Sequence, residues 1–185
     1  MGILGDSLQR AAENTFTRPV PKSAGAQMRF LVRQYKGSTR EVARLLGVSQ
    51  RTVERYVKDQ LRHPRKDLAA RLTAEVRRRW QPKVRQRARD QAATSTGIVI
   101  ETRARFGFTA APGTTDDARQ RLITQHLPPD YAARLFEAQS AGAAEQHLRE
   151  IAAEGLQEVY FKDSGRRAAG LLVEFTDIDY AEFDY

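Results

Sequence analysis

Residues 39–57 read TREVARLLGVSQRTVERYV, and this stretch decides how the N-terminal part of the chain folds. Its apolar side chains recur at helical spacing on both sides of one glycine, and they are Val42, Ala43, Leu46, Val48, Val53 and Tyr56. Gly47 stands where a tight turn between helices needs a positive φ, and Ser49 is a favourable N-cap for a second helix. The stretch therefore predicts two short helices, over 39–46 and 49–58, joined by a tight turn.

The exposed side of the second predicted helix carries the side chains that point to DNA. The whole stretch resembles the helix-turn-helix of bacterial DNA-binding proteins, in which the second helix enters the major groove. The base contacts predicted on this ground are Gln50, Arg51, Thr52 and Arg55. Arg51 or Arg55 can bind guanine in a bidentate manner, and Gln50 can do so with adenine. A helical hairpin without a DNA-binding role is the alternative.

Polar and cationic residues around this stretch predict contacts with the phosphate backbone. Residues 38–40 begin the first helix, and the run RRRWQPKVRQRAR at 77–89 supplies many cations, whose binding to phosphates releases counterions. The predicted backbone contacts are Ser38, Thr39, Arg40, Lys58, Arg77, Arg78, Arg79, Lys83, Arg85, Arg87 and Arg89. Trp80, inside the run, either ends an apolar stripe that begins at Leu68 or stacks on an unpaired base.

Charge is divided unevenly along the 185 residues, whose net charge is +8. Residues 1–95 contain 22 Lys and Arg against 8 Asp and Glu, whereas residues 96–185 contain 9 against 15. This asymmetry predicts nucleic-acid contact by the first half and a different task for the second. A basic surface that serves solubility alone is the alternative.

Composition excludes several classes of function. The chain has no cysteine, so disulfide scaffolds, thiol nucleophiles and Cys-ligated metal sites are ruled out, and its three histidines lack metal-ligand spacing. No apolar run reaches the roughly 20 residues of a membrane span and no signal-peptide pattern is present, so we expect a cytoplasmic protein without a membrane partner. No catalytic constellation occurs, and Asp116-Asp117 would need a third ligand to hold Mg²⁺. We therefore expect no enzyme activity, no catalytic residues, no metal site and no intrinsic cofactor.

Periodicity predicts an α+β fold that is mainly α. The other predicted elements are helices over 3–13, 26–36, 68–80, 115–126, 129–139 and 143–161 and strands over 98–108 and 170–176. We expect a basic helical domain with the helix-turn-helix over 1–95, then a small acidic domain of order β-α-α-α-β over 96–185. The tail 173–185 alternates acidic and aromatic residues, and it is expected to bind a partner, to fold back on the basic half or to stay solvated.

The chain as a whole resembles the terminal proteins of Streptomyces-type linear chromosomes and plasmids. The resemblance rests on the helix-turn-helix in a basic N-terminal half, the sequence PGTTDD at 112–117, the acidic C-terminal half and the length. It implies a protein that caps telomeric DNA in the nucleoid, primes end-patching synthesis and becomes covalently attached to the DNA 5′ end. It also implies two protein partners, a telomere-associated DNA-binding protein and a DNA polymerase, the latter supplying Mg²⁺ and the deoxynucleotide.

The resemblance favours Thr114 as the threonine whose hydroxyl accepts the nucleotide, with Thr115 as the alternative. A free hydroxyl is a weak nucleophile, so its activation would come from the polymerase rather than from this chain. Thr114 with Asp117 also fits a capping box at a helix start, which is a purely structural interpretation. The alternative function is a helix-turn-helix transcriptional regulator whose C-terminal half is a dimerisation or effector module.

Overall fold

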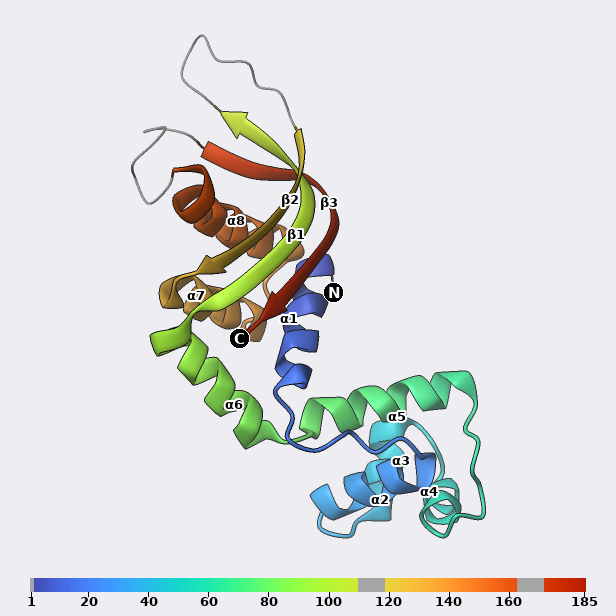
Figure 1. The fold of residues 1–185 in the computed structure, drawn as a ribbon. Coiled ribbons are helices and arrows are strands. Elements are labelled where there is room, and N and C mark those ends of the chain that lie inside the picture. Colours follow the sequence, from blue (N-terminus) through green and yellow to red (C-terminus); the bar gives the residue numbers. More distant parts are fainter. Residues whose placement is uncertain (1, 110–118, 163–171) are drawn as a thin grey trace. The chain divides into compact units, whose positions relative to one another are not determined.

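A computed structural model of the protein describes residues 2–109, 119–162 and 172–185 (Figure 1). The chain forms two compact units: residues 17–82, which we call the helical unit, and residues 1–16 with 83–185, which we call the sheet unit. This division differs from the expected boundary at residue 95. The reason is that the N-terminal helix and, after residue 82, Ala92 place apolar side chains in the core of the sheet unit.

The helical unit contains four helices around its own core. They are α2 (Ala24–Gln34), α3 (Thr39–Leu46), α4 (Gln50–Val57) and α5 (Lys66–Arg79). Leu68, Leu72 and Val76 are buried at intervals of four residues, so α5 presents one apolar stripe to this core, as its spacing predicts. Burying a side chain such as Leu72 completely stabilises the unit by about 1.5–3 kcal/mol.

A glycine in the left-handed conformation joins α3 to α4. Gly47 has φ 63° and ψ 40°, a region that residues with a Cβ atom rarely adopt. The N–H of Val48 donates to the carbonyl of Ala43 at 3.0 Å and closes the last turn of α3. The hydroxyl oxygen of Ser49 accepts from the N–H of Thr52 at 3.2 Å and caps α4. Two helices and a tight turn therefore lie where the spacing predicts them.

The described part of the sheet unit has three antiparallel strands in the order β2-β1-β3. They are β1 (Ile98–Thr109), β2 (Arg119–Leu127) and β3 (Leu172–Asp184). The described α-helices of this unit are α1 (Ile3–Asn14), α6 (Pro82–Gln91), α7 (Pro129–Ser140) and α8 (Glu145–Leu156); α6 belongs to the unit from Lys83 onward. Short π-helices at Ala92–Thr96 and Gln157–Phe161 follow α6 and α8. The described residues thus form an α+β structure that is mainly helical, as expected.

Side chains along β1 alternate between a buried and an exposed face of the sheet. The buried ones are Ile98, Ile100, Thr102, Ala104 and Phe106. The intervening Glu101, Arg103 and Arg105 are exposed. Because the buried residues share one core with α1, α7 and α8, these helices cover one face of the sheet and leave the other open.

The N-terminal helix is held to the sheet unit by residues far away in the sequence. Leu4 and Leu8 are fully buried in the core of that unit. The carboxylate of Glu145, at the start of α8, accepts from the N–H of Leu4 at 2.7 Å and so caps α1. The hydroxyl of Ser7 accepts from the N–H of Phe183 in β3 at 3.0 Å. These contacts explain why the first 16 residues do not belong to the helical unit.

The helix predicted over 115–126 is wrong for the part that the structure describes. Residues 119–127 form β2, which pairs with β1 from Phe106↔Arg119 to Ile98↔Leu127. Ile123 and Leu127 are buried and, being four residues apart, lie on the same face of this strand, whereas the neighbouring Leu122 is exposed. Leu122, Ile123 and Leu127 also fit a helical stripe, so local spacing did not separate the two states. The described order after residue 97 is therefore β-β-α-α-β rather than β-α-α-α-β.

The acidic and aromatic tail is a strand of the sheet. Most of it lies in β3, which pairs antiparallel with β1. Phe183 and Ala181 face the core, whereas Asp179 and Glu182 lie on the exposed side. The tail folds back, but it pairs with β1 of the acidic half rather than lying mainly on the basic half, which it contacts where the hydroxyl of Ser7 accepts from the N–H of Phe183. The acidic residues of the tail are thereby aligned on the open face of the sheet.

Candidate nucleic-acid interface

Two arginines project from α4 without an internal partner. Arg51 and Arg55 are exposed, and among the described residues neither side chain forms an ion pair or a hydrogen bond. They are four residues apart, so they lie on the same side of the helix. Val53 and Tyr56 hold the opposite side of α4 in the core. The arrangement leaves both guanidinium groups available to a ligand outside the chain.

The side chain of Gln50, the first residue of α4, is engaged by two neighbours. Its amide nitrogen Nε2 donates to Glu54 Oε1 at 2.9 Å and to Thr39 Oγ1 at 3.1 Å. The hydroxyl of Thr39 in turn donates to Glu54 Oε1 at 3.4 Å. Glu54 was not among the residues predicted from the sequence, although its position four residues after Gln50 is the helical spacing for such a contact.

The other predicted contacts on α3 and α4 divide into caps and exposed cations. The hydroxyl of Thr52 shares a hydrogen bond with that of Ser49 at 2.8 Å, and the hydroxyl of Ser38 accepts from the N–H of Glu41 at 3.2 Å. These hydroxyls therefore stabilise helix starts. Arg40, Lys58 and the unpredicted Arg44 are exposed. Exposed cations of this kind suit contacts with phosphate, which lysine binds as a compact charge and arginine with its planar fork of donors.

The predicted basic run at 77–89 spans the boundary between the two units. Its exposed members are Arg77, Arg78, Lys83 and Arg87, and its half-buried members are Arg79, Arg85 and Arg89. Arg77 to Arg79 end α5 in the helical unit, whereas residues 83–89 belong to α6 in the sheet unit. The structure thus divides a run that is continuous in sequence between two units.

The half-buried arginines of α6 are packed inside the sheet unit. Arg89 donates from Nη2 to Gln139 Oε1 at 2.6 Å, and its guanidinium lies 5.3 Å from the centre of the Phe136 ring. The guanidinium of Arg85 lies 5.5 Å from the centre of the Phe16 ring. Burial and the nearby charge of Arg89 lower the pKa of Arg85. Their guanidinium groups serve packing within the unit, so a DNA contact would have to compete with it.

Arg79 is held in the same way within the helical unit. Its side chain is 24% exposed, contacts the carboxylate of Glu75 and donates from Nη2 to the hydroxyl of Tyr35 at 2.9 Å. Its guanidinium also lies over the Tyr35 ring, 5.6 Å from the ring centre. Arg78 pairs with Glu75 as well, but the side chain of Arg78 is 63% exposed.

Replacing Arg79 with alanine is expected to lower the free energy of unfolding by about 1 kcal/mol, because a half-buried hydrogen bond and a cation–π contact are lost. Arg71→Ala on the same helix removes an exposed pair with Asp67 at 3.4 Å and should cost less than about 0.5 kcal/mol. Urea denaturation of the two variants measures the difference. Equal stability of both variants, with weaker DNA binding for Arg79→Ala, would return Arg79 to a phosphate-binding role.

Trp80 is partly buried and packs against the core of the helical unit. Its ring packs edge-on against Phe30 with 5.0 Å between the ring centres. The indole N–H donates to the carbonyl of Arg18 at 3.0 Å. Both ends of the side chain are thus occupied, which supports the interpretation that Trp80 ends the apolar stripe of α5 rather than stacking on a base.

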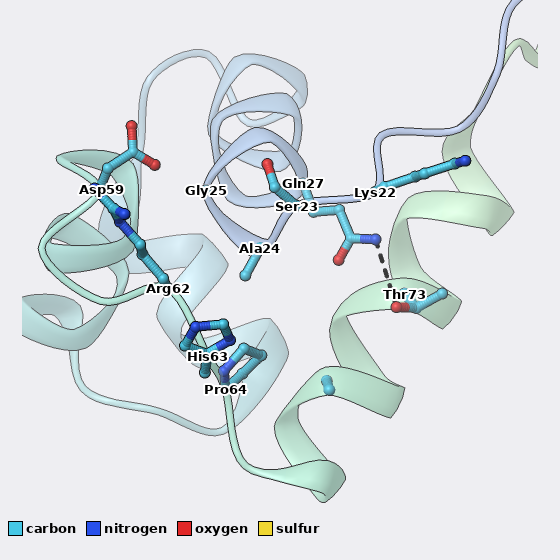
Figure 2. Close-up of a pocket in the computed structure, with 11 residues that line it drawn as sticks. Lys22, Ser23, Ala24, Gly25, Gln27, Asp59, Arg62, His63, Pro64 and Thr73 are labelled. Atoms are coloured by element: carbon cyan, nitrogen blue, oxygen red, sulfur yellow. Dashed lines mark hydrogen bonds between the residues drawn. The ribbon is translucent and has the colours of Figure 1, made fainter.

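A cavity of about 700 Å³ lies beside the start of α2 in the helical unit (Figure 2). Lys22, Arg62 and His63 contribute positive or titratable groups to its wall, and Asp59 contributes an acidic one. Asp59 is paired with Arg29 at 2.8 Å, which offsets its charge. No motif in the sequence indicates this hollow, because its wall is assembled from segments that lie far apart along the chain.

The predicted priming residues cannot be placed in this geometry. Thr114, Thr115 and the Asp116-Asp117 pair lie outside the described residues. Within the described ranges, no group of His, Asp and Glu is arranged to hold a metal ion, and no helix is long and apolar enough to cross a membrane. No family model, curated protein or solved structure matches the chain.

Proposed function

We propose that the helical unit is a helix-turn-helix module that binds double-stranded DNA, with α4 as the helix that reads bases in the major groove. One observation carries this proposal: the capped pair of α3 and α4, closed by Gly47, leaves Arg51 and Arg55 exposed and without a partner among the residues that the structure describes. Arginine in this position is suited to bidentate contacts with guanine.

The charge of the helical unit supports the same proposal. Residues 17–82 contain 17 Lys and Arg against 5 Asp and Glu, so about one third of the chain carries more than half of its 31 basic residues and a net charge of +12. A surface of this charge attracts DNA and speeds association. The remaining residues carry a small negative net charge, which makes the sheet unit a poor candidate for unassisted DNA binding.

The finer proposal is that the chain caps linear DNA ends in the nucleoid and primes their completion. It rests on the resemblance to terminal proteins and on Thr114, the threonine that this resemblance favours as the nucleotide acceptor. In this reaction the threonine oxygen attacks the α-phosphate of a deoxynucleotide, the hydroxyl proton is lost and pyrophosphate leaves. A DNA polymerase would supply the metal ions, and a telomere-associated DNA-binding protein would bring the complex to the end.

The salt dependence of binding tests the DNA-binding proposal. Four exposed cations of the helical unit, Arg40, Lys58, Arg77 and Arg78, would neutralise about four phosphates, which predicts a slope of about −3.6 for log K against log salt. Affinity of the full chain for duplex DNA should then fall about 150-fold between 50 and 200 mM salt. Fluorescence anisotropy with a labelled duplex measures this slope.

Two variants separate specific phosphate contacts from a general effect of charge. Arg40→Ala with Lys58→Ala should make the slope shallower by about 2. Arg134→Ala, which removes a cation paired with Glu154 at 2.5 Å in the sheet unit, should leave the slope unchanged. An unchanged slope in the Arg40 and Lys58 double variant would contradict the assignment of these residues to phosphate.

A further inference from the structure

We propose that Thr39 and Glu54 hold Gln50 so that it presents only a hydrogen-bond acceptor to DNA, which makes α4 accept adenine and cytosine alike at one position of its site. This inference rests on the proposed DNA-binding function of α4 and assigns Thr39 and Glu54 as positioning residues for base selectivity. It replaces the expectation that Gln50 binds adenine in a bidentate manner.

The orientation of the Gln50 amide follows from the chemistry of its neighbours. An ionised carboxylate only accepts hydrogen bonds, so the NH₂ group of Gln50 must face Glu54, at 2.9 Å. The hydroxyl of Thr39 donates to Glu54 at 3.4 Å and is thereby left to accept the second amide hydrogen of Gln50, at 3.1 Å. Both donors of the amide are used within the chain, and its carbonyl oxygen remains as the group to present.

A side chain that offers only a hydrogen-bond acceptor distinguishes fewer bases than a side-chain amide that offers both an acceptor and a donor. In the major groove, adenine offers an amine at N6 and cytosine an amine at N4, whereas guanine and thymine offer oxygens at the corresponding places. A carbonyl oxygen can therefore accept a hydrogen bond from the amine of adenine or cytosine. It cannot do so from guanine or thymine on the same strand, because these bases present an oxygen at that place. Only a free NH₂ group, donating to adenine N7, separates adenine from cytosine.

The hydrogen bonds among Thr39, Gln50 and Glu54 should consequently limit how well α4 distinguishes adenine from cytosine. Removing either partner of Gln50 frees an amide hydrogen, which can then donate to N7. Thr39→Val does this without a change of charge, and Glu54→Ala does it with the loss of one negative charge. At the base-pair position that Gln50 contacts, both variants are expected to prefer adenine over cytosine, whereas the wild-type chain binds the two equally. If Thr39 and Glu54 served only to stabilise the fold, their replacement would leave base preference unchanged.

The experiment is a selection of binding sites from a randomised duplex library with the full chain. The position read by Gln50 is the one whose preference disappears in Gln50→Ala. At that position the wild-type chain should bind adenine and cytosine within about two-fold of each other and guanine or thymine about five-fold more weakly, the effect of one hydrogen bond. Thr39→Val and Glu54→Ala should prefer adenine over cytosine about five-fold.

A modified base gives a second readout on the same sites. 7-Deazaadenine keeps the N6 amine but lacks N7. It should therefore change the DNA affinity of the wild-type chain by less than about two-fold and weaken DNA binding by Thr39→Val and by Glu54→Ala about five-fold. Glu41→Ala is the matched control for charge, because Glu41 is an exposed acid on α3 outside the network. It should keep the equal acceptance of adenine and cytosine.

Two results would overturn the inference. One is a wild-type preference for adenine alone that 7-deazaadenine weakens, because Gln50 would then be using its NH₂ group. The other is sequence-selective binding in which no position depends on Gln50. Both leave the proposed DNA-binding function intact. A chain that binds duplex DNA but selects no sequence would remove the base-reading role of α4 together with the inference, and a chain that binds no DNA would remove the proposed function itself.

Discussion

Replacing Thr114 with alanine is expected to abolish covalent attachment of a deoxynucleotide to the chain. The full-length protein, a DNA polymerase partner, Mg²⁺ and a labelled deoxynucleotide should give label that stays with the wild-type chain after boiling in detergent. The physical reason is that a phosphodiester to a side-chain oxygen survives denaturation, whereas noncovalent binding does not. Mass spectrometry after nuclease digestion should place one residual nucleotide on residue 114.

Conservative variants distinguish the loss of the acceptor from the loss of structure. Thr114→Ser keeps a hydroxyl and should retain labelling, and Thr115→Ala should label like the wild type. If Thr114 also caps a helix, its replacement by alanine lowers stability by about 0.5–2 kcal/mol, so thermal unfolding must accompany the assay. A folded Thr114→Ala chain that is still labelled would transfer the role to another residue, with Thr115 the first to test.

This labelling also separates the two functions left open by the sequence. A transcriptional regulator would bind DNA through α4 without forming any covalent link to it. DNA binding with no label on any residue of the wild-type chain, in the presence of an active polymerase partner, would therefore favour the regulator.

Replacing Arg51 and Arg55 with alanine is expected to cause a large loss of DNA affinity. Each arginine that binds a guanine contributes about 1–3 kcal/mol of discrimination, so each single variant should weaken binding to the preferred site by about 5- to 150-fold. Because both side chains are exposed on α4, their removal should leave the core and the unfolding temperature nearly unchanged. Titration of selected and scrambled duplexes at one salt concentration measures both affinity and selectivity.

The control for this prediction removes the same charge elsewhere in the helical unit. Arg71→Ala should weaken binding to selected and scrambled duplexes by the same small factor, because Arg71 is on α5 and paired with Asp67. The double variant of Arg51 and Arg55 should instead lose most of the difference between the two duplexes. Undiminished selectivity in that variant would contradict the role of α4 as the reading helix.

Sequence periodicity predicted the elements whose packing is local. The helices around Gly47 and the stripe of α5 are set by contacts between residues three or four apart, together with a turn that favours glycine. The same reasoning predicted Trp80 at the end of the α5 stripe. It failed for residues 119–127, because a strand gains its stability from a partner, and here that partner is β1, which lies earlier in the chain.

The candidate site shows the same division. The sequence alone predicted that Arg51 and Arg55 lie on the exposed side of α4. Their positions follow from helical spacing and from the burial of Val53. It missed the restraint on Gln50, because Thr39 and Gln50 meet only when α3 packs against α4.

By itself, then, the sequence determined that positive charge is concentrated in residues 1–95, that a capped helix pair lies among them, and that residues 96–185 are acidic and contain strands. Only the tertiary structure decided that residues 1–16 join the sheet unit, that the acidic tail becomes β3, and that Arg79, Arg85 and Arg89 serve packing rather than remaining fully exposed. The physical reason is the separation along the chain between the residues that interact. Helix signals depend on neighbours within one or two turns, whereas strand pairing and the burial of a charged side chain depend on residues that only folding brings together.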